Sequence, residues 1–261
     1  MRLPIFHVDA FADRLFAGNP AAVCPLPRWL PDETLQAIAA ENALSETAFL
    51  VREEAEYAIR WMTPSVEVDL CGHATLASAH VVFENLEPGR SRVAFRSRSG
   101  ELAVTKEGNH LSMVFPRHAP QRCPAPPGLL QGLKHSPREV LSAVNLLAVY
   151  GTEAEVRALE PDMAVIARLP AQGVIVTAPG RDVDFVSRYF APQAGIPEDP
   201  VTGSAHCSLV PYWSERLRKK QLRARQVSRR GGELFCHDRG DAVVISGRAV
   251  TYLEGFIEVP G

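Results

Sequence analysis

Two short segments, far apart in the chain, place glycine and a polar side chain directly before a run of small residues. They read DLCGHATLASAH (69–80) and EDPVTGSAHCSL (198–209). Each run predicts a helix, opened by Gly72 in the first segment and by Gly203 in the second. The first N–H groups of a helix are unpaired and carry partial positive charge, and glycine lets a carboxylate approach them closely. Two such helix starts predict a clamp for one anionic ligand, whereas the alternative is that the small residues only allow tight helix packing.

Four side chains near these helix starts have the chemistry to handle protons. Glu46 precedes an apolar stretch, where a carboxylate can lie partly buried and act as a general acid or base. His73 and Ser204 directly follow the two opening glycines, and Asp199 precedes the second helix. An imidazole and a hydroxyl flanked by two carboxylates would form a proton-handling ring. The alternatives are a solvated strand end for Glu46, a structural role for His73 and a helix N-cap for Asp199.

Metal, nucleotide and nucleic-acid sites are not predicted. Cys71, His73, His206 and Cys207 could be drawn as a zinc set, but the two adjacent helical residues point about 100° apart. No GxSxG, GxGxxG or GxxxxGK[ST] motif occurs. The basic stretch RLRKKQLRARQVSRR (216–230) has no interleaved aromatic residues, so we expect a solvated helix end there.

The composition is that of an ordinary globular protein. The 261 residues are 46% hydrophobic and 22% charged, with a formal net charge of −2, so no bias toward nucleic acid or acidic membranes is expected. Five scattered cysteines (Cys24, Cys71, Cys123, Cys207 and Cys236) form no CxxC pair, which favours reduced thiols. The opening segment shows neither a secretory signal nor a membrane span, so we expect a cytoplasmic location.

The elements expected before and after a proline-rich stretch follow the same order. PRHAPQRCPAPPG (116–128) contains five prolines and suits an extended connector. SETAFLV (45–51) matches AQGVIVT (171–177), with Gln172 in the place of Glu46, and both lead through a strand and a proline-containing loop to the glycine-opened helix. This predicts a duplicated domain with a ligand cleft between the copies: an N-terminal half (1–117), a connector (118–128) and a C-terminal half (129–261).

Five motifs, in order along nearly the whole chain, carry a family resemblance. They are FHVDAFADRLFAGNPAAV (6–23), ENALSETAFLV (41–51), DLCGHATLASAHVV (69–82), EDPVTGSAHCSL (198–209) and RRGGEL (229–234). Together they resemble the PhzF-like isomerases of phenazine biosynthesis, which have the diaminopimelate epimerase fold. The resemblance implies an α+β fold of two pseudo-symmetric halves, each a highly bent, mostly antiparallel, barrel-like sheet wrapped around a central helix. It also implies a homodimer, an active site in the cleft, and no cofactor or metal.

The resemblance also implies roles for individual residues. Glu46 would shuttle a proton between carbons of a small carboxylate-bearing substrate, and His73, Asp199 and Ser204 would assist and orient. The substrate would be bound by Gly72, Gly203 and Asn19. The resemblance does not identify the substrate, because these motifs form the proton-transfer site and not the walls that select a ligand.

Two alternatives stay open beside a cofactor-independent isomerase. The related epimerases and racemases use two facing cysteines, and Cys71 stands at the first of those positions, but Pro200 stands near the second. An amino- or hydroxy-acid racemase or epimerase would therefore have to use Glu46 with Cys71. The other alternative is a non-catalytic small-molecule binding protein of the same fold.

Overall fold

The computed structural model describes residues 1–259, which form two compact units. Of the described residues, the first unit comprises 1–114 and 246–259, and the second comprises 115–245. The elements of the first unit are β1 (Arg2–Ala10), β2 (Asn19–Leu26), α1 (Asp32–Asn42), β3 (Glu46–Glu53), β4 (Glu56–Met62), β5 (Glu67–Val68), α2 (Gly72–Val81), the π-helix η1 (Val82–Leu86), β6 (Arg92–Ser97), β7 (Gly100–Glu107) and β18 (Ala249–Glu258). β8 (His110–Pro116) and β17 (Ala242–Gly247) each contain a boundary between the units.

The second unit contains more short helices than the first. Its elements are β9 (Gln121–Arg122), α3 (Leu129–Leu133), β10 (Glu139–Ser142), β11 (Leu146–Val149), α4 (Glu153–Ala158), α5 (Met163–Ile166), β12 (Val174–Pro179), β13 (Phe185–Ala191), the 3₁₀ helix η2 (Pro192–Ala194), β14 (Ile196–Asp199), α6 (Gly203–Leu217), β15 (Gln221–Gln226) and β16 (Gly232–Asp238). The two long helices, α2 and α6, begin at the glycines predicted to open them.

The strands of the two units pair in the same order and directions. In the first unit the order is β18, β1, β2, β3, β4, β6 and β7, with β2–β3 and β4–β6 parallel and the other pairs antiparallel. In the second unit it is β9, β10, β11, β12, β13, β15 and β16, with β11–β12 and β13–β15 parallel. α2 connects the parallel pair β4 and β6, and α6 connects the parallel pair β13 and β15. The predicted duplication is therefore present in the topology.

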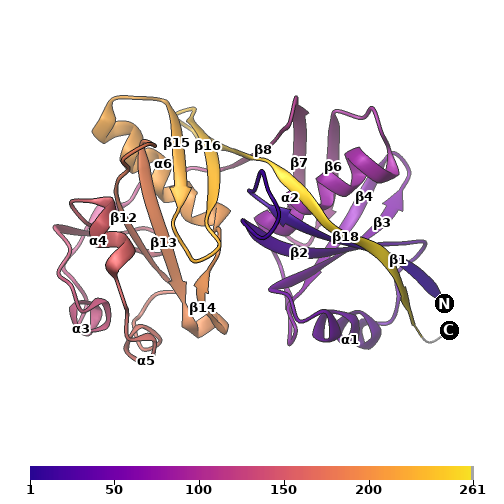
Figure 1. The fold of residues 1–261 in the computed structure, drawn as a ribbon, viewed down its shortest axis with the longest axis horizontal. Helices are drawn as coiled ribbons and strands as arrows, with labels where there is room; N and C mark the ends of the chain where they lie inside the picture. Colours follow the sequence, from indigo (N-terminus) through magenta and orange to yellow (C-terminus); the bar gives the residue numbers. More distant parts are fainter. Residues whose placement is uncertain (260–261) are drawn as a thin grey trace. The chain divides into compact units, whose positions relative to one another are not determined.

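In the first unit the sheet is buried on both faces. Leu3 and Ile5 of β1, with Phe49 of β3, belong to a core cluster that includes Leu35 and Ile38 of α1. The alternate residues of the same strands lie on the other face, because side chains of a strand point to opposite sides in turn. That face meets α2, which contacts β1, β2 and β3. Figure 1 shows the bent sheet of this unit around α2, with α1 outside it.

α2 has the composition of a helix enclosed by other elements. Eight of its ten residues are buried, and half of those are alanine or serine, which allow strands to pack close to the helix on all sides. In the second unit, α6 likewise buries most of its residues, including Trp213, whose indole is stacked on Phe185.

The C-terminal strand differs from the predicted domain boundaries. β18 pairs along its length with β1, so residues 246–259 lie in the first unit and not in a continuous C-terminal half. The proline-rich residues 116–128 belong to the second unit, where β9 adds a short edge strand to β10. Two proline-free residues, Gln121 and Arg122, form that strand, so the prolines themselves do not interrupt its pairing.

The basic stretch 216–230 is a solvated helix end, as expected, only in its first residues, and its later residues form a strand. α6 ends at Leu217, with Arg218 in the left-handed conformation as its C-cap. β15 begins at Gln221, and alternate side chains of β15 are buried. Arg216, Arg218, Lys219 and Lys220 are exposed at the end of α6 and in the turn after it. Arg223 and Arg225 instead alternate with buried residues of β15, a period-2 pattern that the high charge of the stretch concealed.

Candidate functional site

The start of α2 is enclosed and positively polarised. Cys71 precedes the helix in an extended conformation, Gly72 is its first residue and His73 its second. No acidic residue lies in the first turn, so no carboxylate of the helix itself offsets the partial positive charge of its unpaired N–H groups. His73 is only 7% exposed. The imidazole is therefore held in a low-dielectric environment at the positive end of the helix.

Glu46 is brought to the same place by the parallel pairing of β2 and β3. It is the first residue of β3, aligned with Ala21 of β2, and it is 8% exposed. Its Oε2 atom lies 3.1 Å from Nε2 of His73. The structure thus brings two of the predicted catalytic side chains into direct contact inside one unit.

The contact between Glu46 and His73 is close but not aligned as a hydrogen bond. Both Glu46 Oε2 and His73 Nε2 are buried and lack an aligned partner, although they lie within ion-pair distance of each other. Buried polar atoms are nearly always hydrogen-bonded, and exceptions often mark functional sites. Catalytic contacts are commonly loose before substrate binds, so this geometry suits a site that tightens around a ligand.

Cys71 lies on the opposite side of the imidazole. Its Sγ atom is 3.5 Å from His73 Nδ1, so the order of contacts is Cys71, His73, Glu46. The ligating atoms of these three residues lie within 4.8 Å of one another, as those of a metal site would. However, Cys71 and Glu46 face different nitrogens of the ring, and a metal ion would bond only one of them. The arrangement fits a proton relay better than a metal centre, and the absence of a metal stays a prediction.

The surroundings shift the pKa values of His73 and Cys71. Burial alone would lower the pKa of His73, but the neighbouring Cys71 and the Glu46 carboxylate outweigh it and raise the pKa well above its ordinary value. Burial raises the pKa of the Cys71 thiol, and the Glu46 charge raises it further. Because Cys71 thereby stays protonated, we assign the raised pKa of His73 to Glu46. At neutral pH the site then holds an imidazolium and a neutral thiol beside Glu46.

Asn19 lies at the same end of the sheet as Glu46. It is the first residue of β2 and fully buried, two positions before Ala21, the residue aligned with Glu46. The turn before it depends on Gly18, whose φ is +68° and where an added Cβ would lie 2.1 Å from the carbonyl oxygen of Ala10. Only glycine adopts this positive φ readily and has no Cβ to clash with the Ala10 carbonyl. Gly18 therefore allows the turn that fixes the position of Asn19.

The second unit holds the remaining predicted residues near the start of α6. Gly203 is the first residue of the helix and is buried, whereas Ser204 is exposed. Asp199 is the last residue of β14, and its Oδ2 accepts a hydrogen bond from the Thr202 hydroxyl at 2.5 Å. Thr202 itself is the N-cap residue, so Asp199 does not cap the helix and instead holds the residue that precedes it.

The residues of the rejected zinc set have structural roles in the second unit. His206 Nδ1 lies 2.8 Å from the carbonyl oxygen of Thr202, and burial lowers the pKa of His206 to about 4. The imidazole is therefore neutral at pH 7 and donates from Nδ1 to that carbonyl. In the first unit, Thr75 stands at the equivalent helix position and its hydroxyl donates to the carbonyl oxygen of Cys71 at 2.6 Å. His206 thus performs the same capping task as Thr75.

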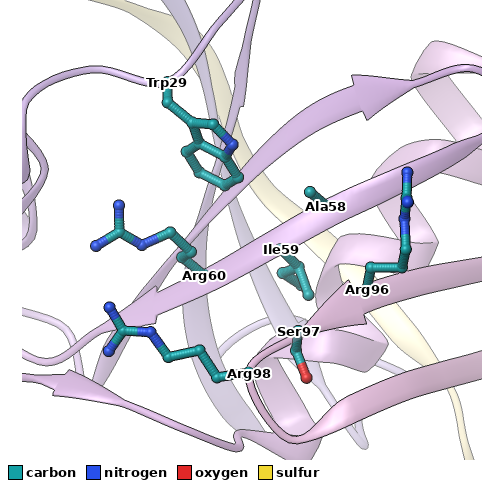
Figure 2. A pocket seen from close by; sticks show the side chains of 7 residues that line it. All are labelled: Trp29, Ala58, Ile59, Arg60, Arg96, Ser97 and Arg98. Atoms are coloured by element: carbon teal, nitrogen blue, oxygen red, sulfur yellow. The ribbon is translucent and has the colours of Figure 1, made fainter.

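A hollow of about 410 Å³ in the first unit contains none of the predicted site residues (Figure 2). Its lining residues are Trp29, Ala58, Ile59, Arg60, Arg96, Ser97 and Arg98. All three arginines are ion-paired, with three carboxylates in total: Arg60 with Asp32 and Glu67, Arg98 with Glu67, and Arg96 with Glu53. Because these carboxylates neutralise the guanidinium groups, the hollow lacks the free positive charge that would recognise an acidic metabolite.

The structure gives two residues a larger role than the sequence did. The sequence offers Cys71 as a candidate thiol for a racemase, and the structure shows that it contacts His73. The available signal was its position two residues before His73, at the start of the same helix. Thr202 was not singled out, although a threonine directly before a helix-opening glycine is a common capping residue.

Comparison with known proteins identifies similar chains over the full length. The family model PhzC-PhzF, described as phenazine biosynthesis-like protein, matches residues 8–255. An uncharacterized isomerase of Pseudomonas aeruginosa is 53% identical over 259 residues, covering 99% of this chain and 100% of the relative. A crystal structure of a PhzF family phenazine biosynthesis protein from Enterococcus faecalis superposes with a TM-score of 0.97 at 46% identity, covering 99% of this chain and 100% of that chain.

A more distant structure shares the fold alone. A hydroxyproline epimerase from Agrobacterium vitis superposes with a TM-score of 0.61 at 10% identity, covering 98% of this chain and 92% of that chain. The predicted α+β epimerase-like fold and the predicted resemblance are both confirmed by these matches. In the described residues, no helix combines the length and the apolar character needed to cross a membrane.

Proposed function

Because the chain belongs to the PhzC-PhzF family of phenazine biosynthesis-like proteins, we propose that it is an isomerase that moves a proton on a small carboxylate-bearing metabolite without a cofactor. In this proposal Glu46 is the general acid/base. The observation that carries it is the buried contact between Glu46 Oε2 and His73 Nε2 at 3.1 Å, beside the open end of α2.

The charges in the first unit suit removal of a proton from carbon. His73, whose pKa is raised, supplies a positive charge 3.1 Å from Oε2 of Glu46, the side chain that would accept the proton. The negative charge that develops on the substrate needs stabilisation by fixed donors, and the N–H groups at Gly72 and His73 supply them. Glu46 then returns the same proton to another carbon, which completes an isomerisation with no net gain or loss of protons.

Residues of the second unit have proposed roles in the same reaction. Gly203 would hold a substrate carboxylate at the start of α6, and Asp199 and Ser204 would orient the reacting carbons. The support for these roles is the repeated topology, since α6 occupies in the second unit the place that α2 occupies in the first. Asn19 would bind substrate beside Glu46.

The proposal is tested by isotope exchange. The protein is incubated with a panel of small carboxylates in deuterium oxide, and carbon-bound exchange and isomerisation are followed by NMR. We expect at least one compound to exchange, and Glu46→Gln to abolish exchange while binding of that compound stays measurable. Unchanged exchange in Glu46→Gln removes Glu46 from the mechanism, and binding without any exchange in the wild type favours a non-catalytic binding protein.

A racemase or epimerase that uses Cys71 with Glu46 is the second candidate. The contact between Cys71 Sγ and His73 Nδ1 places the thiol at the site, which favours this candidate, but burial raises the pKa of Cys71 and opposes formation of a thiolate. Loss of all exchange in Cys71→Ala would support it. The homodimer and the cytoplasmic location stay predictions that sedimentation and cell fractionation can test.

A further inference from the structure

We propose that Gln226 is a positioning residue that holds the turn carrying Asp199, Thr202 and Gly203; this inference rests on the proposed function for the catalytic meaning of that turn. Gln226 is the last residue of β15 and its side chain is fully buried. It does not belong to any of the motifs that carry the family resemblance, and no sequence pattern assigned it a role.

Gln226 makes three hydrogen bonds to the turn. Its Oε1 accepts from the backbone N–H of Thr202 at 2.9 Å, and its Nε2 donates to the carbonyl oxygen of Asp199 at 2.7 Å and to the Thr202 hydroxyl at 3.1 Å. One side chain therefore fixes the backbone of the turn at both of its ends. A buried amide with its partners in place specifies one conformation, because leaving any of these groups unpaired is costly.

These bonds continue to the Asp199 carboxylate. The Thr202 hydroxyl accepts from Gln226 Nε2 and donates its own hydrogen to Asp199 Oδ2 at 2.5 Å. The hydroxyl has a single hydrogen, so the donor from Gln226 directs that hydrogen toward the carboxylate. Gln226 thus orients the Asp199 side chain through Thr202 without touching a substrate.

The strands around Gln226 make it a rigid support. β15 pairs with β16 along its whole length, and Gln226 is aligned with Ser187 of β13 on the other side. The next residues extend the support, because the Val227 N–H donates to the Ser187 carbonyl and the Ser228 hydroxyl donates to the Pro200 carbonyl at 2.8 Å.

The first unit lacks the equivalent of these bonds. Ser97, the last residue of β6, stands where Gln226 stands on β15, and its hydroxyl donates to the nearby Gly100 carbonyl. The neighbouring support is shared by both units: the Ser99 hydroxyl donates to the Asp69 carbonyl at 2.8 Å, just as Ser228 does to Pro200. Gln226 is therefore an addition to a repeated support, found in the unit that carries Asp199.

The test compares Gln226→Met, which keeps the length of the side chain but removes all three bonds, with Gln193→Met as a matched control. Gln193 lies in the same unit, and its Nε2 donates to the Leu169 carbonyl at 2.6 Å, away from the turn. In the full-length protein, amide hydrogen exchange at Thr202 is measured by NMR for the wild type and both variants. We expect Gln226→Met to accelerate exchange at Thr202 by about tenfold or more, and Gln193→Met to leave it unchanged.

The catalytic consequence is measured with whichever carboxylate undergoes carbon exchange with the wild type. We expect kcat/KM to fall by about 10- to 100-fold in Gln226→Met, mainly through kcat, because misplacing an orienting group by about 1 Å costs up to about 100-fold. The thermal stability of Gln226→Met should fall below that of the control because it leaves buried polar groups unpaired, so the kinetics are measured at a temperature where both variants are folded. Should Gln226→Met fail to fold, Thr202→Val serves instead. It removes only the bridging hydroxyl, so we expect the same fall in kcat with the Thr202 amide still protected.

The outcomes separate this inference from the proposed function. Unchanged exchange at Thr202, or unchanged kcat/KM in both Gln226→Met and Thr202→Val, overturns the positioning role. If Glu46→Gln is inactive in the same assays, the proposed function still stands. Full activity in Glu46→Gln overturns the function, whereas the Thr202 exchange result still decides whether Gln226 holds the turn.

Discussion

Glu46 Oε2 lies 3.1 Å from His73 Nε2, and the two side chains reach this contact from different kinds of element. Glu46 is the first residue of a strand whose position is set by its parallel neighbour β2, and His73 is the second residue of the helix that the sheet encloses. Both are buried, so each charge acts on the other with little screening by water. The pair therefore places the proposed base next to the unpaired N–H groups at the start of α2.

Shortening the side chain at position 46 should separate the effect of the carboxylate itself from the effect of its position. Glu46→Asp keeps a base but withdraws it by one methylene from the substrate and from His73, whereas Glu46→Gln keeps the shape and removes the base. We expect Glu46→Asp to lower kcat about 100-fold and Glu46→Gln to lower it to background. Steady-state kinetics with a responsive carboxylate measure both. Activity in Glu46→Asp close to that of the wild type would show that the length of the side chain matters less than this geometry implies.

The pH dependence of stability should reveal the raised pKa of His73. Burial opposes the imidazolium, but Cys71 and Glu46 outweigh it, so the folded-state pKa lies well above the unfolded value of about 6.5. The folded state then binds more protons between the two values. The resulting stabilisation is fully present below about pH 6.5 and is lost as pH rises through the folded pKa.

Urea unfolding from pH 5.5 to 9.5 checks this sign by comparing the wild type with His73→Gln. We expect the advantage of the wild type to be largest at the acidic end and to shrink toward alkaline pH. His80→Gln is the control with the opposite sign, because burial lowers the pKa of His80, so that its contribution is lost as pH falls. An advantage at position 73 that grows with pH would contradict the imidazolium and carboxylate pair.

Cys71 should contribute through its contact with His73 and not as a base. The pKa of the thiol is raised by burial and by Glu46, so at neutral pH its sulfur retains the proton. We therefore expect Cys71→Ser, which keeps a polar group beside His73 Nδ1, to stay within about threefold of wild-type activity, and Cys71→Ala to lose about three- to tenfold. Treatment with a thiol-alkylating reagent, with and without substrate, gives an independent measurement. Complete inactivation of both variants would instead support the racemase.

The sequence predicted the elements whose signals are local. Gly72 and Gly203 open their helices as expected, and the matched segments predicted the repeated strand order, because glycine, proline and hydrophobic period act over a few residues. The sequence grouped Glu46 and His73 as proton-handling residues, but it could not predict their direct contact, since that contact depends on the register between β2 and β3.

Other features depend on pairings that are distant in sequence. The pairing of β18 with β1 could not be predicted from the sequence of either strand. Each sequence taken alone is compatible with an edge strand or a central strand. The role of Gln226 could not be predicted for a different reason. It lies within a basic stretch that was expected to form a helix end, and the groups it bonds belong to a turn many residues earlier. A buried polar network of this kind becomes visible only when the strands that carry it are assembled.

Gly18 should be the most sensitive glycine of the first unit, because its backbone and its surroundings both exclude a side chain. In Gly18→Ala the new Cβ would lie 2.1 Å from the Ala10 carbonyl oxygen, at a φ of +68°. Gly89→Ala is the matched control, since its φ is +94° but nothing lies within 4 Å of an added Cβ. We expect Gly89→Ala to lose about 1 kcal/mol of unfolding free energy and Gly18→Ala to lose roughly 3 kcal/mol or more, because strain and clash add. Because the turn at Gly18 positions Asn19, activity at a temperature where Gly18→Ala remains folded should also fall, with KM rising more than kcat falls. Equal losses of stability in the two alanine variants would show that the turn relaxes to accept a side chain, and Asn19 would then not depend on Gly18 for its place.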